Sequence, residues 1–396
     1  MMSSAVKKSV FWFALLWLAG CSTTTIRTTE VTPAIQEPQS FPEDQLLDVG
    51  IGIFNPGVDD LSVAEDGVYP QVRRAEARYM PYQLMDTLQK TGNWGIVRVV
   101  PNRQSEMDLW VDAEILKSDG ESLQLMVKVQ DSSGKVWFTK KYSEAASKYS
   151  YENETGIPRE PFQSLYNHIA NDMLAFRSVL TAEQARKLRT ISELKFAKAF
   201  APDVYTDYLD ADGKGHYSIK RLPAANDPVL LRVRKIRERD YLFLDTMQEY
   251  YGSFVDQMRD PYMSWRKESY VETMALRDLK RKSRERLLGG ALAVLAGIAG
   301  VASNNPYAQA AGSVGIGAGA YVFKSGLDKR DEAKMHVQAL EELGKSLDAE
   351  MQPHTVTLED RTVTLKGTVN EQYAQWRKLL RDIYLTETGQ TAPVGH

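Results

Sequence analysis

Residues 287–323 read LLGGALAVLAGIAGVASNNPYAQAAGSVGIGAGAYVF and contain no charged side chain, although 26% of the residues in the chain are charged. A stretch of this length has to be buried in protein or placed against lipid. The turn signal Ser303–Pro306 separates two apolar arms, so we predict a helical hairpin. Each arm would be about 24 Å long, which is short of an apolar bilayer core of about 30 Å.

Small residues recur every fourth position in both arms of this stretch. They are Gly289, Ala293, Gly297 and the nearby Gly300 in the first arm, and Ala311, Gly315 and Gly319 in the second. This spacing places small residues on one helical face and lets two helices approach closely. In a water-soluble helix each glycine lowers stability by about 1 kcal/mol relative to alanine. Close contact between helices in lipid makes this cost tolerable, so the pattern favours contact with lipid.

The stretch resembles the glycine-zipper hairpins of small outer-membrane lipoproteins. Basic runs flank it at 277–286 and 324–330, where lipid phosphates could bind them. A hairpin buried in protein, or in the core of an oligomer, remains the alternative.

The amino terminus has the organisation of a secretory signal, so we expect residues 1–20 to be a signal peptide. Lys7 and Lys8 precede the apolar stretch Val10–Leu18, which is too short for a lasting membrane span. The signal ends in the residues Leu18, Ala19, Gly20 and Cys21.

These four residues resemble the bacterial lipoprotein signal, or lipobox. The resemblance implies cleavage before Cys21, which then carries a diacylglycerol group and an N-acyl chain. This covalent lipid is the only cofactor expected. Cys21 is the single cysteine of the chain, which excludes an intramolecular disulfide.

The residues after Cys21 bear on localisation. By resemblance to the enteric sorting pattern, in which Asp at the second position retains a lipoprotein in the inner membrane, Ser22 implies the outer membrane. Residues 21–41 are rich in Thr, Ser, Pro and Gln and are predicted to be a flexible tether. We expect a lipid-anchored protein that is mainly periplasmic.

A first domain is predicted at residues 42–180 from alternating and helical apolar patterns. Strands are expected within 46–57, 95–100, 108–118, 122–131 and 135–142, and helices at 70–92 and 161–180. We expect Pro81 to kink or divide the first helix. The element order, with VGIGIFNPG and TGNWGIVRVVP, resembles the small α/β domain of curli-secretion-type lipoproteins and the amino-terminal domain of TolB. The resemblance implies a module that binds a protein partner.

Residues 181–286 are predicted to be a helical region. Thr181 and Gln184 fit a capping box. Asp227-Pro228 and Asp260-Pro261 each fit a helix start, because Asp caps the first turn and proline presets its φ angle. We therefore expect two long antiparallel helices.

The carboxyl-terminal residues 324–388 are predicted to form an αββα unit, followed by a loose tail at 389–396. A helix is expected at 332–351, two short strands around Glu359-Asp360, and a helix after a cap at Asn370. With VTLKGTV, this order weakly resembles a BON domain, a periplasmic module associated with phospholipid or protein binding. It departs from that pattern in its turn and in lacking a final strand.

No pattern of catalytic or metal-binding residues stands out. No two of the five histidines lie within five residues of each other, so no paired ligands arise, and no nucleophile elbow, phosphate loop or dinucleotide fingerprint is present. The acidic turn near Asp212 does not fit a calcium-binding loop. Tyr208 stands where the loop needs its first ligand, an Asp, and Ile219 stands where it needs the bidentate Glu. A net charge of −3 gives no reason to expect nucleic acid.

The expected fold class is α+β, with a small mixed α/β sheet domain, a long helical segment, the hairpin and the αββα unit. The expected function is that of a non-catalytic scaffold or assembly factor of the bacterial envelope, whose hairpin makes a second membrane contact. Expected partners are membrane lipids and an envelope protein or further copies of the chain. Two alternatives stay open: a component of an oligomeric pore or secretion channel, and an envelope hydrolase with dispersed carboxylates.

Overall fold

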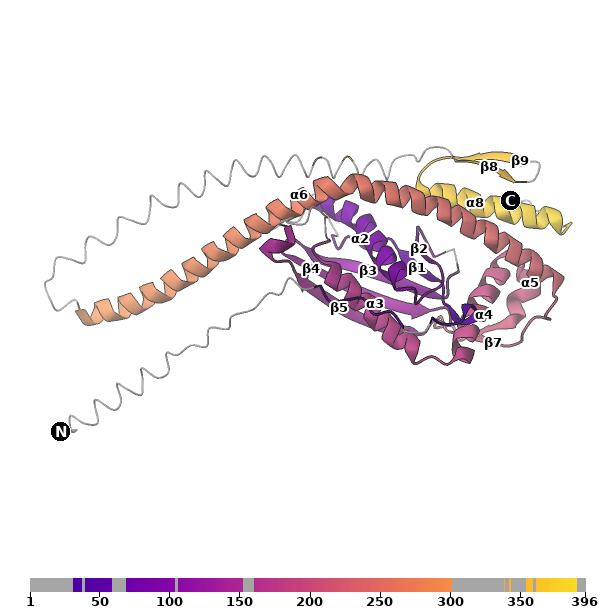
Figure 1. Ribbon diagram of the computed structural model, residues 1–396, viewed down its shortest axis with the longest axis horizontal. Helices are drawn as coiled ribbons and strands as arrows, with labels where there is room; N and C mark the ends of the chain where they lie inside the picture. The colour runs from indigo at the N-terminus through magenta and orange to yellow at the C-terminus, as the bar shows by residue number, and fades with distance from the viewer. Residues whose placement is uncertain are drawn as a thin grey trace, which may run out of the picture. The chain divides into compact units, whose positions relative to one another are not determined.

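The computed structural model describes residues 31–37, 40–58, 69–103, 106–151, 160–300, 338, 342, 354–358 and 361–389 (Figure 1). The signal peptide, Cys21 and the second hairpin arm lie outside these residues. A mixed sheet packed with helices confirms the α+β class.

A five-stranded sheet forms the centre of the part of the chain that we call the α/β domain. Its strands are β1 (Val49–Gly52), β2 (Val97–Val100), β3 (Leu109–Ser118), β4 (Ser122–Asp131) and β5 (Val136–Ala145), in the order β2-β1-β3-β4-β5. β1 pairs in parallel with β2 and β3, whereas β3, β4 and β5 form an antiparallel meander. The five predicted strands are therefore confirmed, and β2 lies at one edge of the sheet.

Two helices cover one face of this sheet, α2 (Pro70–Thr91) and α3 (Gln163–Ser178) (Figure 1). The inward side chains of β4 alternate along the strand, as a half-buried strand requires, and they join α2 and α3 in one core. Gly92 ends α2 in the left-handed conformation. α2 continues through Pro81, so the predicted division is wrong.

The remaining elements before α6 are one longer helix and several short pieces. The longer helix is α4 (Ala182–Phe200). The short pieces are the single turns η1 (Glu43–Gln45), η2 (Lys148–Tyr151), α5 (Pro202–Tyr205) and η3 (Thr206–Tyr208), and the hairpin of β6 (Leu209–Ala211) and β7 (Tyr217–Ile219). The predicted capping box between Thr181 and Gln184 is present at the start of α4. The acidic turn near Asp212 joins β6 to β7.

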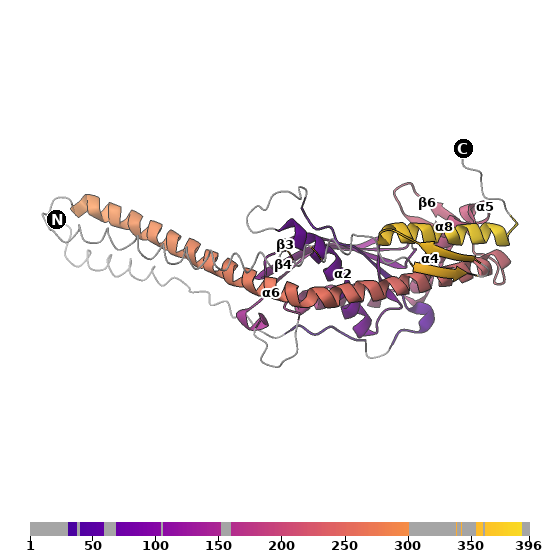
Figure 2. The same ribbon diagram turned by 90° about the horizontal axis from the view of Figure 1, so that it is seen from above.

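One continuous helix, α6, runs from Pro228 to Gly300 (Figure 2). The predicted antiparallel pair is therefore wrong. An interior proline costs a helix about 3 kcal/mol. Immediately after Pro261, however, Tyr262 and Trp265 are almost completely buried against the domain. Burying a large side chain contributes about 1.5–3 kcal/mol, so these two offset the proline and the helix continues.

The carboxyl-terminal unit contains β8 (His354–Leu358), β9 (Arg361–Leu365) and α8 (Val369–Glu387). β8 and β9 pair in antiparallel orientation, as expected. The cap of α8 is Thr368, which forms a capping box with Glu371, so the predicted cap at Asn370 is wrong by two residues. Thr368 takes this role because Glu371 stands three positions after it and completes the capping box.

Candidate functional site: the junctions of helix α6

The site residues predicted from sequence fall only partly within the described chain. Leu18, Ala19, Gly20, Cys21, Ala311, Gly315 and Gly319 lie outside it. Gly289, Ala293, Gly297 and Gly300 belong to the last turns of α6. Helical geometry there places the first three along one side of the helix. Within the part of the chain that the structure describes, no helix combines the length and apolar character needed to cross a membrane.

Helix α6 connects the α/β domain with the start of the glycine-rich segment. Along its first half it packs against β2, α2, α4 and α8. Most of the contact is apolar, but polar contacts interrupt it, and we call three groups of them the junctions of α6. These junctions hold deeply buried ionisable groups, so they form the candidate site.

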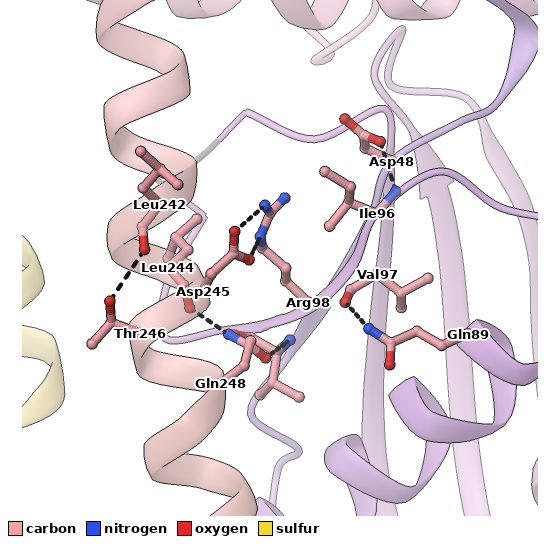
Figure 3. Close-up of polar contacts among 11 residues, drawn as sticks. Asp48, Gln89, Ile96, Val97, Arg98, Leu242, Leu244, Asp245, Thr246 and Gln248 are labelled. Atoms are coloured by element: carbon pink, nitrogen blue, oxygen red, sulfur yellow. Dashed lines mark hydrogen bonds and ion pairs between the residues drawn. The ribbon is translucent and has the colours of Figure 1, made fainter. Parts of the chain in front are cut away.

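The first junction joins α6 to the outer edge of β2 (Figure 3). Arg98 of β2 donates two hydrogen bonds to Asp245 of α6, from Nε to Oδ1 at 2.7 Å and from Nη2 to Oδ2 at 3.0 Å. The Arg98 guanidinium also lies 4.5 Å from the ring centroid of Tyr241. Such a bidentate pair fixes orientation as well as distance, so α6 cannot slide along β2 without breaking it.

A side-chain amide completes the hydrogen bonding of the same edge. Gln248 of α6 accepts from the main-chain N–H of Val99 at 2.8 Å and donates to its carbonyl at 2.9 Å. On the same strand, Gln89 of α2 donates to the Val97 carbonyl at 3.0 Å (Figure 3). An edge strand normally exposes such groups to water or to another strand. Here two glutamines occupy them, which lets β2 be buried.

The second junction contains a buried carboxyl group, Glu76 of α2. Its Oε1 accepts from the hydroxyl of Ser118 and, at 2.6 Å, from that of Tyr262 of α6. Arg73 Nε lies 3.8 Å from Oε2. Burial raises the pKa of Glu76, while Arg73 and the two hydroxyl groups act in the opposite direction. One carboxyl group therefore ties together α2, the end of β3 and α6.

Arg266 of α6 lies one turn after Tyr262 and is fully buried. Its Nη1 donates to Oε1 of Glu160 at 2.6 Å, and the Tyr79 hydroxyl donates to Oε2 at 3.1 Å. The Arg266 guanidinium lies 3.9 Å from the ring centroid of Tyr262 and 5.0 Å from that of Phe162. Burial alone lowers the pKa of Arg266, but Glu160 and the surrounding tyrosines raise it, with a net upward shift. The Arg266 guanidinium is thus charged, and both side chains of the pair are enclosed.

The third junction attaches the carboxyl-terminal helix α8 to α6. Asp240 of α6 accepts hydrogen bonds from the Tyr373 hydroxyl and from Arg377 Nη1, both at 3.2 Å. Beside them, the Phe243 and Trp376 rings stack with centroids 4.9 Å apart. Burial raises the pKa of Asp240, and Arg377 acts against this. The junction fixes α8 to the same helix that leads to the glycine-rich segment.

A carboxylate near the first junction bears on the hydrolase alternative. Asp108 is buried; its Oδ2 accepts from the Asp48 main-chain N–H at 2.9 Å and its Oδ1 from the Ser192 hydroxyl. Burial raises the pKa of Asp108, and the neighbouring Asp48 raises it further. Because protein donors occupy both oxygens, the group acts as a structural acceptor. No metal-binding group of three or more His, Cys, Asp or Glu side chains occurs among the described residues.

One sequence pattern indicates that α6 makes buried polar contacts. Arg237 and Asp240 interrupt an otherwise apolar helical stripe, and both make buried polar contacts. Polar residues at core-facing positions are retained only when partners are available. The partners of α6 at the second junction, Glu76 and Glu160, lie more than a hundred residues away, so no local pattern indicates the pairs.

Comparison of the chain with models of protein families, with curated proteins and with solved structures finds no match. Function therefore has to be inferred from the geometry of the three junctions and from the sequence motifs.

Proposed function

We propose that the protein is a lipid-anchored lipoprotein of the bacterial outer membrane that acts as a non-catalytic scaffold or assembly factor. Residues 18–21 and the glycine-rich segment support the membrane part of this proposal. The observation that carries the scaffold part is the continuity of α6, which is fixed to the α/β domain by buried polar junctions and continues into the glycine-rich segment.

A rigid attachment of this kind suits a connecting role. Described contacts between α6 and the domain extend to Arg277, which pairs with the buried Glu121. From Arg277 to Gly300 the helix continues for roughly 35 Å at 1.5 Å per residue. Buried ion pairs resist sliding of α6 along the domain. The domain would therefore keep one orientation relative to the glycine-rich segment and would present the same face to a partner. The acyl chains and the segment would then be two separate membrane contacts.

Membrane fractionation tests the proposal with four forms of the protein. They are the natural chain, a chain with residues 1–21 exchanged for a cleavable secretory signal, a chain lacking 287–323, and the combination of both changes. We expect only the combination to move fully into the soluble periplasmic fraction. Full release by the signal exchange alone would refute the second membrane contact.

Crosslinking of the purified protein separates the scaffold from the pore alternative. A scaffold of this design should give monomers or dimers. Ring-sized species that disappear when residues 287–323 are deleted would support a pore component instead.

A further inference from the structure

The segment of residues 31–37 lies in an extended conformation along α3. It falls within the stretch predicted to be a tether, but its main chain is hydrogen-bonded at almost every second residue. The donors and acceptors come from three side chains of α3, namely Ser164, Asn167 and Asn171, and from Asn93, which follows α2. On α3 these residues are spaced by three and four positions and so share one helical face.

Three asparagine side chains make most of these contacts. Asn167 Nδ2 donates to the Thr32 carbonyl at 2.6 Å, and the Thr32 N–H donates to Ser164 Oγ at 3.1 Å. Asn171 accepts from the Ile35 N–H at 2.8 Å and donates to the Pro33 carbonyl at 3.0 Å.

Asn93 repeats the pattern further along the segment. It donates to the Ile35 carbonyl at 2.9 Å and accepts from the Glu37 N–H at 3.0 Å. An amide side chain that both donates and accepts reproduces the pairing of a neighbouring strand. Asn93 and Asn167 are buried beneath the segment. The segment therefore occupies a site with buried polar side chains and does not merely touch the protein surface.

Asn93, Ser164, Asn167 and Asn171 contact the main chain of the segment, and two of its side chains add contacts of their own. Gln36 Nε2 donates to the Lys90 carbonyl at 2.9 Å, and the Ser178 hydroxyl donates to Glu37 Oε1 at 2.9 Å. The Ile35 side chain remains 53% exposed and that of Val31 39% exposed. Pro33, which has no N–H, stands at a position where only a carbonyl is used. A site of this kind holds extended main chain through its backbone groups, with side-chain contacts added at Gln36 and Glu37.

We propose that Asn93, Ser164, Asn167 and Asn171 form a binding site for extended main chain, whose occupant is residues 32–37 of the same protein, and that this site sets the reach of the lipid anchor. The reach follows from chain length and rests on the acylation of Cys21 that we propose above. With the site occupied, about 11 residues separate Cys21 from Thr32 and span at most roughly 40 Å. With the site empty, about 20 residues separate Cys21 from Phe41, whose ring lies 4.0 Å from the Arg177 guanidinium of α3, and they span up to roughly 70 Å.

Two variants at one position test the site without touching α3. Ile35→Pro removes the N–H that Asn171 accepts, whereas Ile35→Ser keeps it and changes only the exposed side chain. Hydrogen-exchange mass spectrometry on the full chain should show slow exchange across 31–37 in the natural protein and in Ile35→Ser. We expect exchange about tenfold faster or more in Ile35→Pro. Equal exchange in the two variants would overturn the site.

A second pair of variants approaches the same contacts from α3. Asn171→Asp keeps the acceptor for Ile35 but loses the donor to Pro33, and His168→Ala alters an exposed neighbour on the same helix. Faster exchange in 31–37 is expected for the first and not for the second. The same acceleration in His168→Ala would mean that α3 itself had been disturbed, and would contradict specific recognition.

Energy transfer from the protein to a bilayer tests the reach. Acylated full-length protein, labelled through Lys141→Cys on β5, is inserted in vesicles that contain an acceptor lipid. Cys21 carries its lipid and does not react, so the label enters at one site. We expect transfer to fall severalfold from Ile35→Ser to Ile35→Pro. If hydrogen exchange in residues 31–37 changes but energy transfer does not, the site is present but does not set the reach of the anchor. A mass without lipid on Cys21 would refute the proposed function, while the exchange result would still decide the site.

Discussion

Replacing Arg266 with methionine removes the cation from the second junction while keeping most of the side-chain volume. Both partners of the pair are enclosed: the Arg266 side chain is 0% exposed and that of Glu160 is 6% exposed. The change leaves Glu160 with the hydrogen bond from Tyr79 but without its counter-ion. Breaking a buried ion pair from one side costs about 3–5 kcal/mol, because the remaining charge stays desolvated.

Urea unfolding followed by tryptophan fluorescence measures this cost, since Trp265 is buried beside the pair. With a slope of about 2–3 kcal/mol per molar, the midpoint should fall by roughly 1–2 M. Arg259→Met is the matched control on the same helix, because Arg259 is exposed and pairs with the neighbouring, exposed Asp256. We expect the control to change stability by less than about 0.5 kcal/mol.

The double variant Arg266→Met with Glu160→Gln completes the test. Removing both charges should recover much of the loss, because no uncompensated ion remains. If Arg266→Met costs less than about 1 kcal/mol, or if the double variant loses the sum of both single changes, the ion pair does not hold α6 against the domain.

Three further predictions concern the same helix. Gln248→Ala should cost about 1–3 kcal/mol and speed exchange at the amide of Val99, measured by hydrogen exchange, because both main-chain groups of that residue lose their partner. Burial raises the pKa of Glu76 above 4.5, so its contribution to stability is complete below that pH and is lost as pH rises through the higher folded value. Urea midpoints should therefore show Glu76→Gln gaining on the natural protein as the pH rises above about 4.5, and a constant difference would contradict this. Arg377→Met should leave Asp240 buried without a cation and make α8 the first segment released by limited proteolysis, whereas unchanged digestion would show that this contact does not fix α8.

Local sequence patterns predicted most of the fold. The five strands of the sheet follow from alternating apolar residues, and the ends of α2 and α4 follow from Gly92 and from the capping box at Thr181. Where prediction failed, tertiary contacts outweighed a local rule. Pro81 was expected to kink or divide its helix, and Asp260-Pro261 was expected to start a new one. Both helices continue through the proline, because they gain more from packing on the domain than a single proline removes.

The candidate site could be predicted only in outline. Asp240 and Arg237 stood out as polar residues in an apolar stripe, which indicates a buried partner but not its identity. The pairs Arg98–Asp245 and Arg266–Glu160 join residues more than a hundred positions apart, and only the folded chain brings them together. The asparagines along α3 left no local signal, because they contact main chain and no particular sequence.

Metabolic labelling with radioactive palmitate tests the proposed anchoring most directly. Acylation at Cys21 predicts that the natural chain is labelled and that the label disappears in Cys21→Ala, since the chain contains no other cysteine. A natural chain that remains unlabelled, or a label that persists after the substitution, would contradict the proposal that Cys21 anchors this protein to the membrane.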